Sequence, residues 1–253
     1  MSQNITYTSD EILKFYSANR QAWADFYPSE QWVFEHIAGE KGHLGGVFDV
    51  GCAGGGLGAA LCERFNLESY TGIDIHQGII DWAKEHRALK VDSDFIAGDI
   101  STLNLDRQFD LVVSLGCADW NIETDKIIGE CWDKVKPGGY FVVSLRLTTA
   151  RTVNDITKSF QYINFSGNDR EPEKANYVVT NYREAIVLFS SLNPLPEIIG
   201  AYGYWGNPSS TAQTPFERIL FSVFYIRKGA EDKRDCRTEL FLPADVYTEE
   251  RDD

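Results

Sequence analysis

The segment from Asp49 to Gly56 combines a carboxylate with a cluster of glycines, at a spacing that suits a charged small ligand. Residues 47–50 before the cluster read as a strand, and residues 56–65 read as a helix. A strand, a glycine turn and a helix in succession bring bare backbone close to a ligand. Asp49 stands just before the first glycine, where its negative charge would repel a pyrophosphate and suit an ammonium or sulfonium group. The segment therefore predicts a binding turn that disfavours a dinucleotide.

Two further carboxylates follow the next strand-like segments. Asp74 falls within the predicted strand 70–75, and Asp99 follows the predicted strand 94–97. Open α/β sheets bind their ligands at the carboxyl ends of the strands, so we expect Asp49, Asp74 and Asp99 to line one edge. Asp74 can accept hydrogen bonds from both hydroxyls of a ribose, and Asp99 can accept one from an adenine amine.

Alternating strands and helices must position these side chains. The sequence predicts strands at residues 47–50, 70–75, 94–97, 109–115 and 140–147, and helices at residues 56–65, 77–87 and 122–135. This rhythm is typical of a parallel sheet with right-handed crossovers. After an irregular stretch, a helix capped by Thr180 or Asn181 and two strands at residues 195–204 and 218–227 suggest an antiparallel end to the sheet.

The expected fold class is therefore α/β: a Rossmann-like, seven-stranded mixed sheet with helices on both faces. We expect one domain over residues 1–253. Its parts are an N-terminal helical cap (1–44, broken at Pro28), an α/β core (45–228) with an insertion after the fifth strand (148–180), and a loose charged tail (229–253) in which Leu240-Phe241-Leu242 could dock.

Composition narrows the classes of function. The 253 residues are 43% hydrophobic and 13% aromatic, which indicates a folded core. The formal net charge of -14 argues against nonspecific binding to nucleic acid or to an anionic membrane. The five cysteines lack the spacing of a disulfide framework or of a zinc site. With neither a signal peptide nor a membrane-spanning run in this sequence, the expected location is cytoplasmic.

The chain resembles the class I (Rossmann-like) S-adenosylmethionine-dependent methyltransferase family. The matching segments are Asp49-Val50-Gly51-Cys52-Ala53-Gly54-Gly55, Asp74, Gly98-Asp99-Ile100, Phe109-Asp110-Leu111-Val112-Val113-Ser114 and Val135-Lys136-Pro137-Gly138-Gly139-Tyr140. The family pattern is acid-x-Gly-x-Gly-x-Gly, and this chain departs from it at Ala53. The resemblance covers about residues 45–147.

This resemblance implies S-adenosylmethionine as the cofactor and assigns residues to its parts. Asp49 and the segment after it would hold the methionine part, Asp74 the ribose, and Asp99 with Ile100 the adenine. The backbone after Ser114 would lie near the transferred methyl group. The full set of expected cofactor-binding residues is Asp49, Gly51, Cys52, Ala53, Gly55, Asp74, Ile75, Gly98, Asp99, Ile100, Ser114 and Leu115.

Two related kinds of enzyme fit the sequence less well. A nicotinamide enzyme would need a second glycine where Ala53 stands, and Asp49 disfavours the phosphate. An aminopropyltransferase usually has several acidic residues after the fourth strand, whereas the segment 115–120 has only Asp119. No metal is expected, because a metal-dependent enzyme would need a second acidic group at the end of the fifth strand and Asn154-Asp155 come too late.

The acceptor side is less well marked in the sequence. Asp119, Arg146 and Tyr182 are the candidate acceptor contacts, and Arg146 could hold a carboxylate or phosphate. The insertion 148–180 is predicted to be a substrate lid. The expected function is methyl transfer to a small or medium polar acceptor, an oxygen of a sugar, glycan or metabolite. An aminopropyltransferase-like enzyme and a non-catalytic, cofactor-binding partner subunit remain the alternatives.

Overall fold

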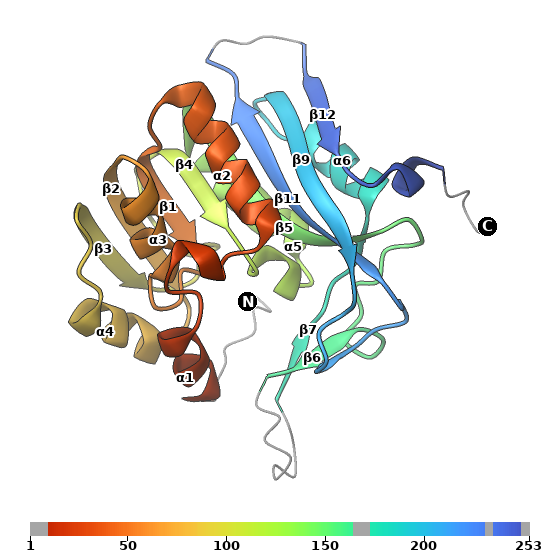
Figure 1. Cartoon of the computed structure of the whole chain (residues 1–253), viewed down its shortest axis with the longest axis horizontal. Helices are drawn as coiled ribbons and strands as arrows, with labels where there is room; N and C mark the ends of the chain where they lie inside the picture. The colour runs from red at the N-terminus through yellow and green to blue at the C-terminus, as the bar shows by residue number, and fades with distance from the viewer. Residues whose placement is uncertain (1–9, 164–172, 231–234, 249–253) are drawn as a thin grey trace.

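The computed structural model describes residues 10–163, 173–230 and 235–248. One large mixed sheet crosses the molecule in the order β12-β9-β11-β5-β4-β1-β2-β3 (Figure 1). The strands from β3 to β5 are parallel to one another, and β11 is antiparallel to both β5 and β9. The bounds are β1 Gly45–Val50, β2 Leu67–Asp74, β3 Asp92–Ala97, β4 Phe109–Ser114, β5 Val135–Thr148, β9 Pro196–Gly206, β11 Ile219–Lys228 and β12 Arg237–Phe241.

The predicted α/β class and seven-stranded core are confirmed, and two strands enlarge the sheet. β12 pairs with β9 at one edge, and the short β8 (Thr180–Asn181) pairs with the end of β5. β5 begins at Val135, earlier than predicted, and takes in the turn at Gly138, which has a φ of 76°. The strand order reverses between β1 and β4, which is where open α/β sheets bind ligands.

Helices cover both faces of the sheet. Their bounds are α1 Asp10–Ala18, α2 Pro28–Lys41, α3 Gly56–Arg64, α4 Gln77–His86, α5 Thr124–Asp133 and α6 Tyr182–Ser190, with single turns η1 Trp23–Asp25, η2 Ala118–Trp120 and η3 Ala244–Tyr247. Pro28 separates α1 from α2 as expected, and it stands in the first turn of α2, where its missing N–H group costs nothing. None of the helices in the described ranges combines the length and the apolar character needed to cross a membrane.

Two apolar clusters hold the layers together. On one face, side chains of α2, α3 and α4 pack on the sheet; Val33, Leu61 and Ile80 are completely buried there. On the other face, α5 and α6 do the same, with Trp132 and Phe189 among the buried side chains. Burial at this scale fixes the helices, and through them the strand ends, because each buried large side chain contributes about 1.5–3 kcal/mol.

The tail is ordered where the structure describes it, so the expectation of a loose tail is wrong for residues 235–248. β12 continues the sheet, and the side chain of Val246 in η3 is completely buried. The ring centroids of Phe241 and of Trp32 on α2 are 4.9 Å apart. Pairing with β9 and these apolar contacts hold the segment on the sheet although it carries several charged residues. The predicted docking of Leu240-Phe241-Leu242 agrees with this arrangement.

The insertion also contains more structure than expected. Its strands β6 (Phe160–Tyr162) and β7 (Lys174–Asn176) form a small antiparallel sheet with β10 (Ala212–Gln213), which lies below the main sheet in Figure 1. Residues 164–172, which lie within the insertion, fall outside the described residues. The strands are three residues long or shorter, which is why no hydrophobic period marks them in the sequence.

Candidate functional site

The turn between β1 and α3 adopts a backbone conformation that favours glycine. Gly51, Ala53 and Gly55 have φ values of 79°, 47° and 71°, all in the left-handed region. The N–H groups of Gly51 and Cys52 both donate to the carbonyl oxygen of Ile73 on β2, at 2.8 and 3.0 Å. The turn is thereby fastened at the carboxyl end of the sheet, where the sequence predicts a ligand.

Neighbouring groups press closely on the glycines of this turn. A Cβ atom on Gly51 would lie 2.6 Å from Sγ of Cys117, and one on Gly54 would lie 2.8 Å from the ring of Trp82. A Cβ atom on Gly56 would overlap the carbonyl oxygen of Arg20. These three positions therefore admit only glycine in the present arrangement.

Asp74 is fixed against the turn by backbone donors. Its Oδ2 accepts a hydrogen bond from the N–H of Ala53 at 3.0 Å, and its Oδ1 accepts one from the N–H of His76 at 2.9 Å. Burial raises the pKa of Asp74, and the N–H groups of His76 and Ala53 oppose the rise. Each carboxylate oxygen keeps further lone-pair capacity. Asp74, at the end of β2 and followed by the half-buried Ile75, is therefore oriented to accept hydrogen bonds from a ligand.

Asp49 lies inside β1 and not at the edge, so the expected line of three carboxylates is corrected to two at the edge and one behind it. The side chain is 3% exposed, and its Oδ2 accepts a hydrogen bond from the hydroxyl of Tyr70 at 2.6 Å. Burial raises the pKa of Asp49 to about 7, while the Tyr70 hydroxyl and the charge of Arg20 oppose the rise. Its place before the turn is as predicted, but a hydroxyl already occupies one of its oxygens.

Asp99 follows β3 and closes a local turn. Its Oδ1 accepts hydrogen bonds from the backbone N–H and the hydroxyl of Ser101, at 2.9 and 2.8 Å. Gly98 just before it donates its N–H to the carbonyl oxygen of Asp74, at 2.9 Å. The side chain of Ile100 is buried in the core beneath α5. The predicted adenine end therefore adjoins Asp74, with Asp99 partly engaged by Ser101.

The carboxyl end of β4 lies on the opposite side of the turn. Ser114 is completely buried, and Leu115 packs against the cluster beneath α2. Gly116, with a φ of 59°, donates its N–H to the hydroxyl of Ser144 on β5 at 2.7 Å. Cys117 then contacts Gly51, as described above. The structure thus brings the ends of β1, β2, β3 and β4 together around one turn.

The N-terminal cap supplies neighbours that sequence reasoning missed. Arg20 lies near enough to Asp49 to oppose the rise in the pKa of that carboxyl. Burial raises the pKa of the Tyr16 phenol, and the nearby Asp74 and Cys117 add to the rise while Arg20 opposes it. The Arg20 guanidinium pairs with Glu30 at 3.0 Å. No local pattern marks Tyr16 or Arg20, because they meet the turn only through the docking of the cap.

A chain of hydrogen bonds ties the cap to the turn. Arg87 donates from Nε to the carbonyl oxygen of Gly54 at 2.9 Å and from Nη2 to the side chain of Gln21. Gln21 in turn donates to the carbonyl oxygen of Tyr16 at 2.6 Å. The cap is therefore held directly over the glycine turn, as the position of α1 beside α3 and α4 in Figure 1 shows.

Two of the three expected acceptor contacts meet each other. Nε of Arg146 lies 2.6 Å from Oδ2 of Asp119, and both side chains are almost completely buried. Tyr182 instead begins α6 within the core on the α5 and α6 face, and its hydroxyl accepts a hydrogen bond from Arg183 at 2.8 Å. Among the described residues, no hydrogen bond joins Tyr182 to Asp119 or Arg146.

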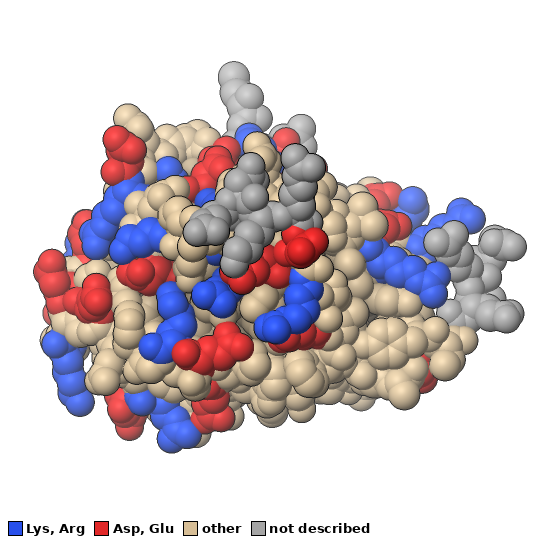
Figure 2. Space-filling view, turned by 90° about the horizontal axis from the view of Figure 1, so that it is seen from above, with Lys and Arg blue, Asp and Glu red and all other residues tan. Residues whose placement is uncertain are grey.

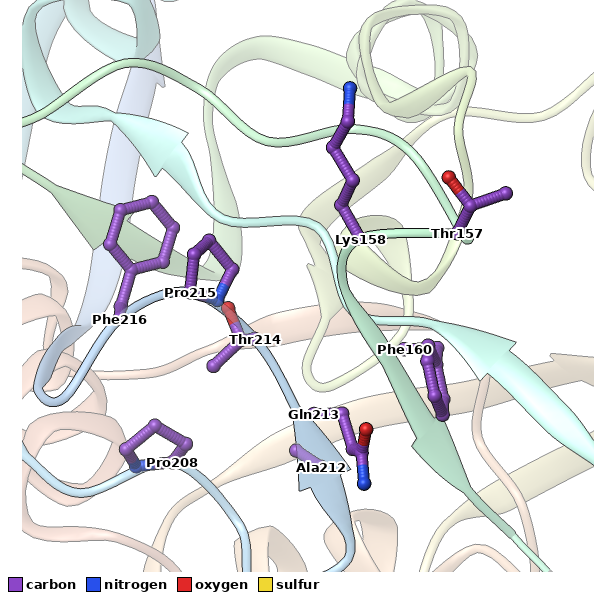
Figure 3. A pocket seen from close by; sticks show the side chains of 9 residues that line it. All are labelled: Thr157, Lys158, Phe160, Pro208, Ala212, Gln213, Thr214, Pro215 and Phe216. Carbon is purple, nitrogen blue, oxygen red and sulfur yellow. The ribbon is translucent and has the colours of Figure 1, made fainter.

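The surface is of mixed charge where it is seen from above. Figure 2 shows basic side chains interspersed among acidic ones on that face. An open hollow lies elsewhere, between the insertion and the segment before β11, with Phe160, Gln213 and Phe216 among its lining side chains (Figure 3). None of the predicted cofactor residues lines it. Among the residues that the structure describes, no three His, Cys, Asp or Glu side chains gather as a metal site would require.

Comparisons with known proteins find methyltransferases. A family model described as a methyltransferase domain matches residues 48–143. Malonyl-[acyl-carrier protein] O-methyltransferase of Priestia megaterium is 32% identical over 39% of this chain and 35% of its own length. Ubiquinone biosynthesis O-methyltransferase of Stutzerimonas stutzeri is 29% identical over 60% of this chain and 66% of its own length. The chain thus spans from about a third to two thirds of these curated relatives.

The solved structures resemble the fold at low identity. An S-adenosylmethionine-dependent methyltransferase from Clostridium acetobutylicum superposes with a TM-score of 0.55 at 15% identity, over 86% of this chain and 98% of its own. The likeness therefore extends beyond the matched family model to the antiparallel end of the sheet. Residues 48–143 thus match a methyltransferase domain, and the sheet order and the carboxylate–glycine turn give the chain the class I (Rossmann-like) fold of S-adenosylmethionine-dependent methyltransferases.

Proposed function

We propose that this protein transfers a methyl group from S-adenosylmethionine to an oxygen of a small or medium polar acceptor, such as a metabolite or a sugar. The observation that carries the proposal is the hydrogen bond from the N–H of Ala53 in the glycine turn to the carboxylate of Asp74. The two curated relatives are both named O-methyltransferases, which supports oxygen as the acceptor atom. The net charge of -14 favours a small acceptor over a nucleic acid.

The residues present fit this cofactor. The turn from Gly51 to Gly56 carries few side chains and follows a left-handed course at Gly51 and Gly55, so it can present backbone groups to a ligand. Asp74 is oriented and retains lone pairs for the two hydroxyls of a ribose. Asp49 supplies a carboxylate behind the turn for the cationic methionine part. Asp99 and Ile100 would border the adenine.

When bound, the cofactor supplies a sulfonium methyl group, which is an electrophile. The chain's own contribution is to hold and orient the reactants. The left-handed backbone at Gly51 and Gly55 sets the course of the turn, and Asp74 fixes its register against β2. Because correct placement of two reactants supplies much of the rate in such transfers, a strong base is not required.

Calorimetry with S-adenosylhomocysteine, the product form of the cofactor, tests the proposal. We expect micromolar binding, about -8 kcal/mol. Asp74→Ala should weaken binding by roughly 1.5–3 kcal/mol, because hydrogen bonds to a charged group are lost. Asp94→Ala is the matched control, since Asp94 is an exposed carboxylate on the adjacent strand β3. Tighter binding of NAD than of S-adenosylhomocysteine would refute the assignment.

A non-catalytic subunit that binds the cofactor is the second candidate. The observation in its favour is that the acidic group after β4, Asp119, is engaged by Arg146 and so is not a free base. Turnover separates the two. Formation of S-adenosylhomocysteine from S-adenosylmethionine with any of a panel of hydroxyl acceptors supports the enzyme, and cofactor binding with no turnover supports the subunit. The same panel extended with polyamines and decarboxylated cofactor tests an aminopropyltransferase.

A further inference from the structure

One oxygen of the Asp119 carboxylate has no hydrogen-bond partner within the described ranges. Oδ2 accepts hydrogen bonds from Nε and from the backbone N–H of Arg146, at 2.6 and 3.2 Å. The carbonyl oxygen of Asp119 accepts one from Nη2 of Arg146 at 2.6 Å and one from the N–H of Val178 at 3.1 Å. The remaining oxygen, Oδ1, is buried without a hydrogen bond, and the residue is 4% exposed. Most buried polar atoms have a partner, so Oδ1 calls for one.

Asp119 stands in η2, directly after the segment that contacts the glycine turn. Cys117, two residues before Asp119, presses its side chain against Gly51. Arg146, which holds the carboxylate, lies near the end of β5, the neighbour of β4 in the sheet. Both groups are thus at the carboxyl edge, next to the turn that fits the cofactor.

The ion pair changes the expectation for an acceptor. The sequence suggested that Arg146 would hold an anionic group. In the structure its guanidinium is already paired with Asp119 and lies 3.8 Å from the ring centroid of Tyr177. The group that still lacks a partner is a hydrogen-bond acceptor with negative charge. It can accept a hydrogen bond from a hydroxyl group, whereas an ionised carboxylate has no hydrogen to donate to it.

Aromatic rings continue the same face of the sheet beside Arg146. Phe221 of β11 lies directly opposite Arg146, and Tyr204 of β9 lies directly opposite Phe221. The rings of Tyr204 and Phe221 are 6.1 Å apart between centroids. Tyr27, which precedes α2, stacks on Phe221 at 6.3 Å and is 54% exposed. We call Tyr27, Tyr204 and Phe221 the aromatic row.

We propose that Asp119 and the aromatic row select an acceptor with a hydroxyl group on a flat ring, and that they disfavour a carboxylate on the same ring. The hydroxyl would donate to Oδ1 of Asp119, and the ring would pack against the row. Arg146 acts as a positioning residue, because it fixes Asp119 through three hydrogen bonds. This inference rests on the proposed function and narrows its acceptor to a class.

Catechol and benzoate are the probes, because they place hydroxyls or a carboxylate on the same ring. Ligand-observed NMR on the protein saturated with S-adenosylhomocysteine should show binding of catechol at least about tenfold tighter than binding of benzoate. Equal binding, a preference for benzoate, or binding of neither at millimolar concentration would overturn the proposal. If S-adenosylhomocysteine itself does not bind, the proposed function is refuted. That outcome differs from one in which the cofactor product binds and catechol does not.

A second experiment tests the role of Asp119 with the variant Asp119→Asn. Its amide oxygen can still accept from Arg146, while an NH₂ donor replaces Oδ1. Catechol affinity should fall about tenfold and the gap to benzoate should close, with cofactor affinity unchanged within about twofold. Asp110→Asn is the control, since Asp110 pairs with Lys136 at 2.8 Å near the start of β4, away from the turn. Selectivity that survives Asp119→Asn refutes the role of Oδ1.

Phe221→Leu keeps the test valid where Asp119→Asn does not fold. Leucine fills much of the space but lacks the flat ring, and Phe221 takes no part in the ion pair. Affinity for catechol and for benzoate should fall together, about three- to tenfold, while the preference for catechol remains. Unchanged affinity for both probes would remove the aromatic row from the acceptor site.

Discussion

The hydroxyl of Tyr70 lies 2.6 Å from Oδ2 of Asp49, and this hydrogen bond joins β2 to β1 just beneath the glycine turn. Both side chains are buried; Tyr70 is 1% exposed and Asp49 is 3% exposed. A carboxyl group in such surroundings favours its neutral form, since burial penalises the charge. The pKa of Asp49 accordingly rises from 3.8 to about 7. The pair therefore makes the region of the turn sensitive to pH.

We expect Asp49 to lower the stability of the protein as the pH rises. The pKa of Asp49 is raised in the folded state. The contribution of this group to the free energy of unfolding is therefore fully present below the ordinary value of 3.8 and is lost as the pH rises through about 7. Each pKa unit is equivalent to about 1.4 kcal/mol. Asp49→Asn, which stays neutral, should gain stability relative to the parent over this window in urea unfolding.

Tyr70→Phe provides the check on that prediction. The hydroxyl of Tyr70 lowers the pKa of Asp49, so its removal should move the pH-dependent loss to higher pH. If the difference between the parent and Asp49→Asn does not change between pH 4 and 8, Asp49 is not the titrating group.

Ala53→Gly should stabilise the protein. Ala53 has a φ of 47°, where a residue with a Cβ atom is strained by about 1–2 kcal/mol. Glycine removes the strain but loses more entropy on folding, so the net gain in the free energy of unfolding should be about 0.5–1 kcal/mol. Ala59→Gly in α3 is the matched control and should instead cost about 1 kcal/mol. Equal losses in both variants would contradict the left-handed assignment.

Gly51→Ala should weaken binding of S-adenosylhomocysteine, with a destabilisation of about 1–3 kcal/mol. The new Cβ atom would lie 2.6 Å from both Cβ and Sγ of Cys117, and the φ of 79° adds strain. Adding Cys117→Gly removes the steric part and should restore some of the affinity measured by calorimetry. No recovery in the double variant would show that backbone strain alone is responsible.

The insertion is predicted to act as a lid, and hydrogen exchange tests this. Its two ends are joined by a pair of hydrogen bonds between the backbones of Val153 and Val179, at 2.9 and 3.1 Å. We expect exchange of these amides to slow further when catechol is added to the protein with S-adenosylhomocysteine. If these amides are as protected from exchange in the empty protein as those of Val112 and Val142 in the central strands, the insertion is a fixed structural element and not a lid.

The predictable parts of this structure are those with a local signal. Glycines and a carboxylate in sequence mark the turn at Asp49, and the hydrophobic strands around Val112 and Val142 mark the sheet. The pairing of Asp119 with Arg146 has no such signal, since one follows β4 and the other lies in β5. Arg20, between α1 and η1, comes near Asp49 only because the cap docks on the turn. Long-range contacts of this kind depend on tertiary packing that a single sequence does not display.

The strand β12 has a consequence for solubility. Without it, the long strand β9 would present a row of unpaired backbone groups to solvent, and such an edge recruits strands of other molecules. β12 closes that edge with five residues, among which Arg237 and Glu239 carry opposite charges. A short, charged outer strand is a poor template for further pairing. We therefore expect residues 237–241 to limit edge-to-edge pairing between copies of this chain.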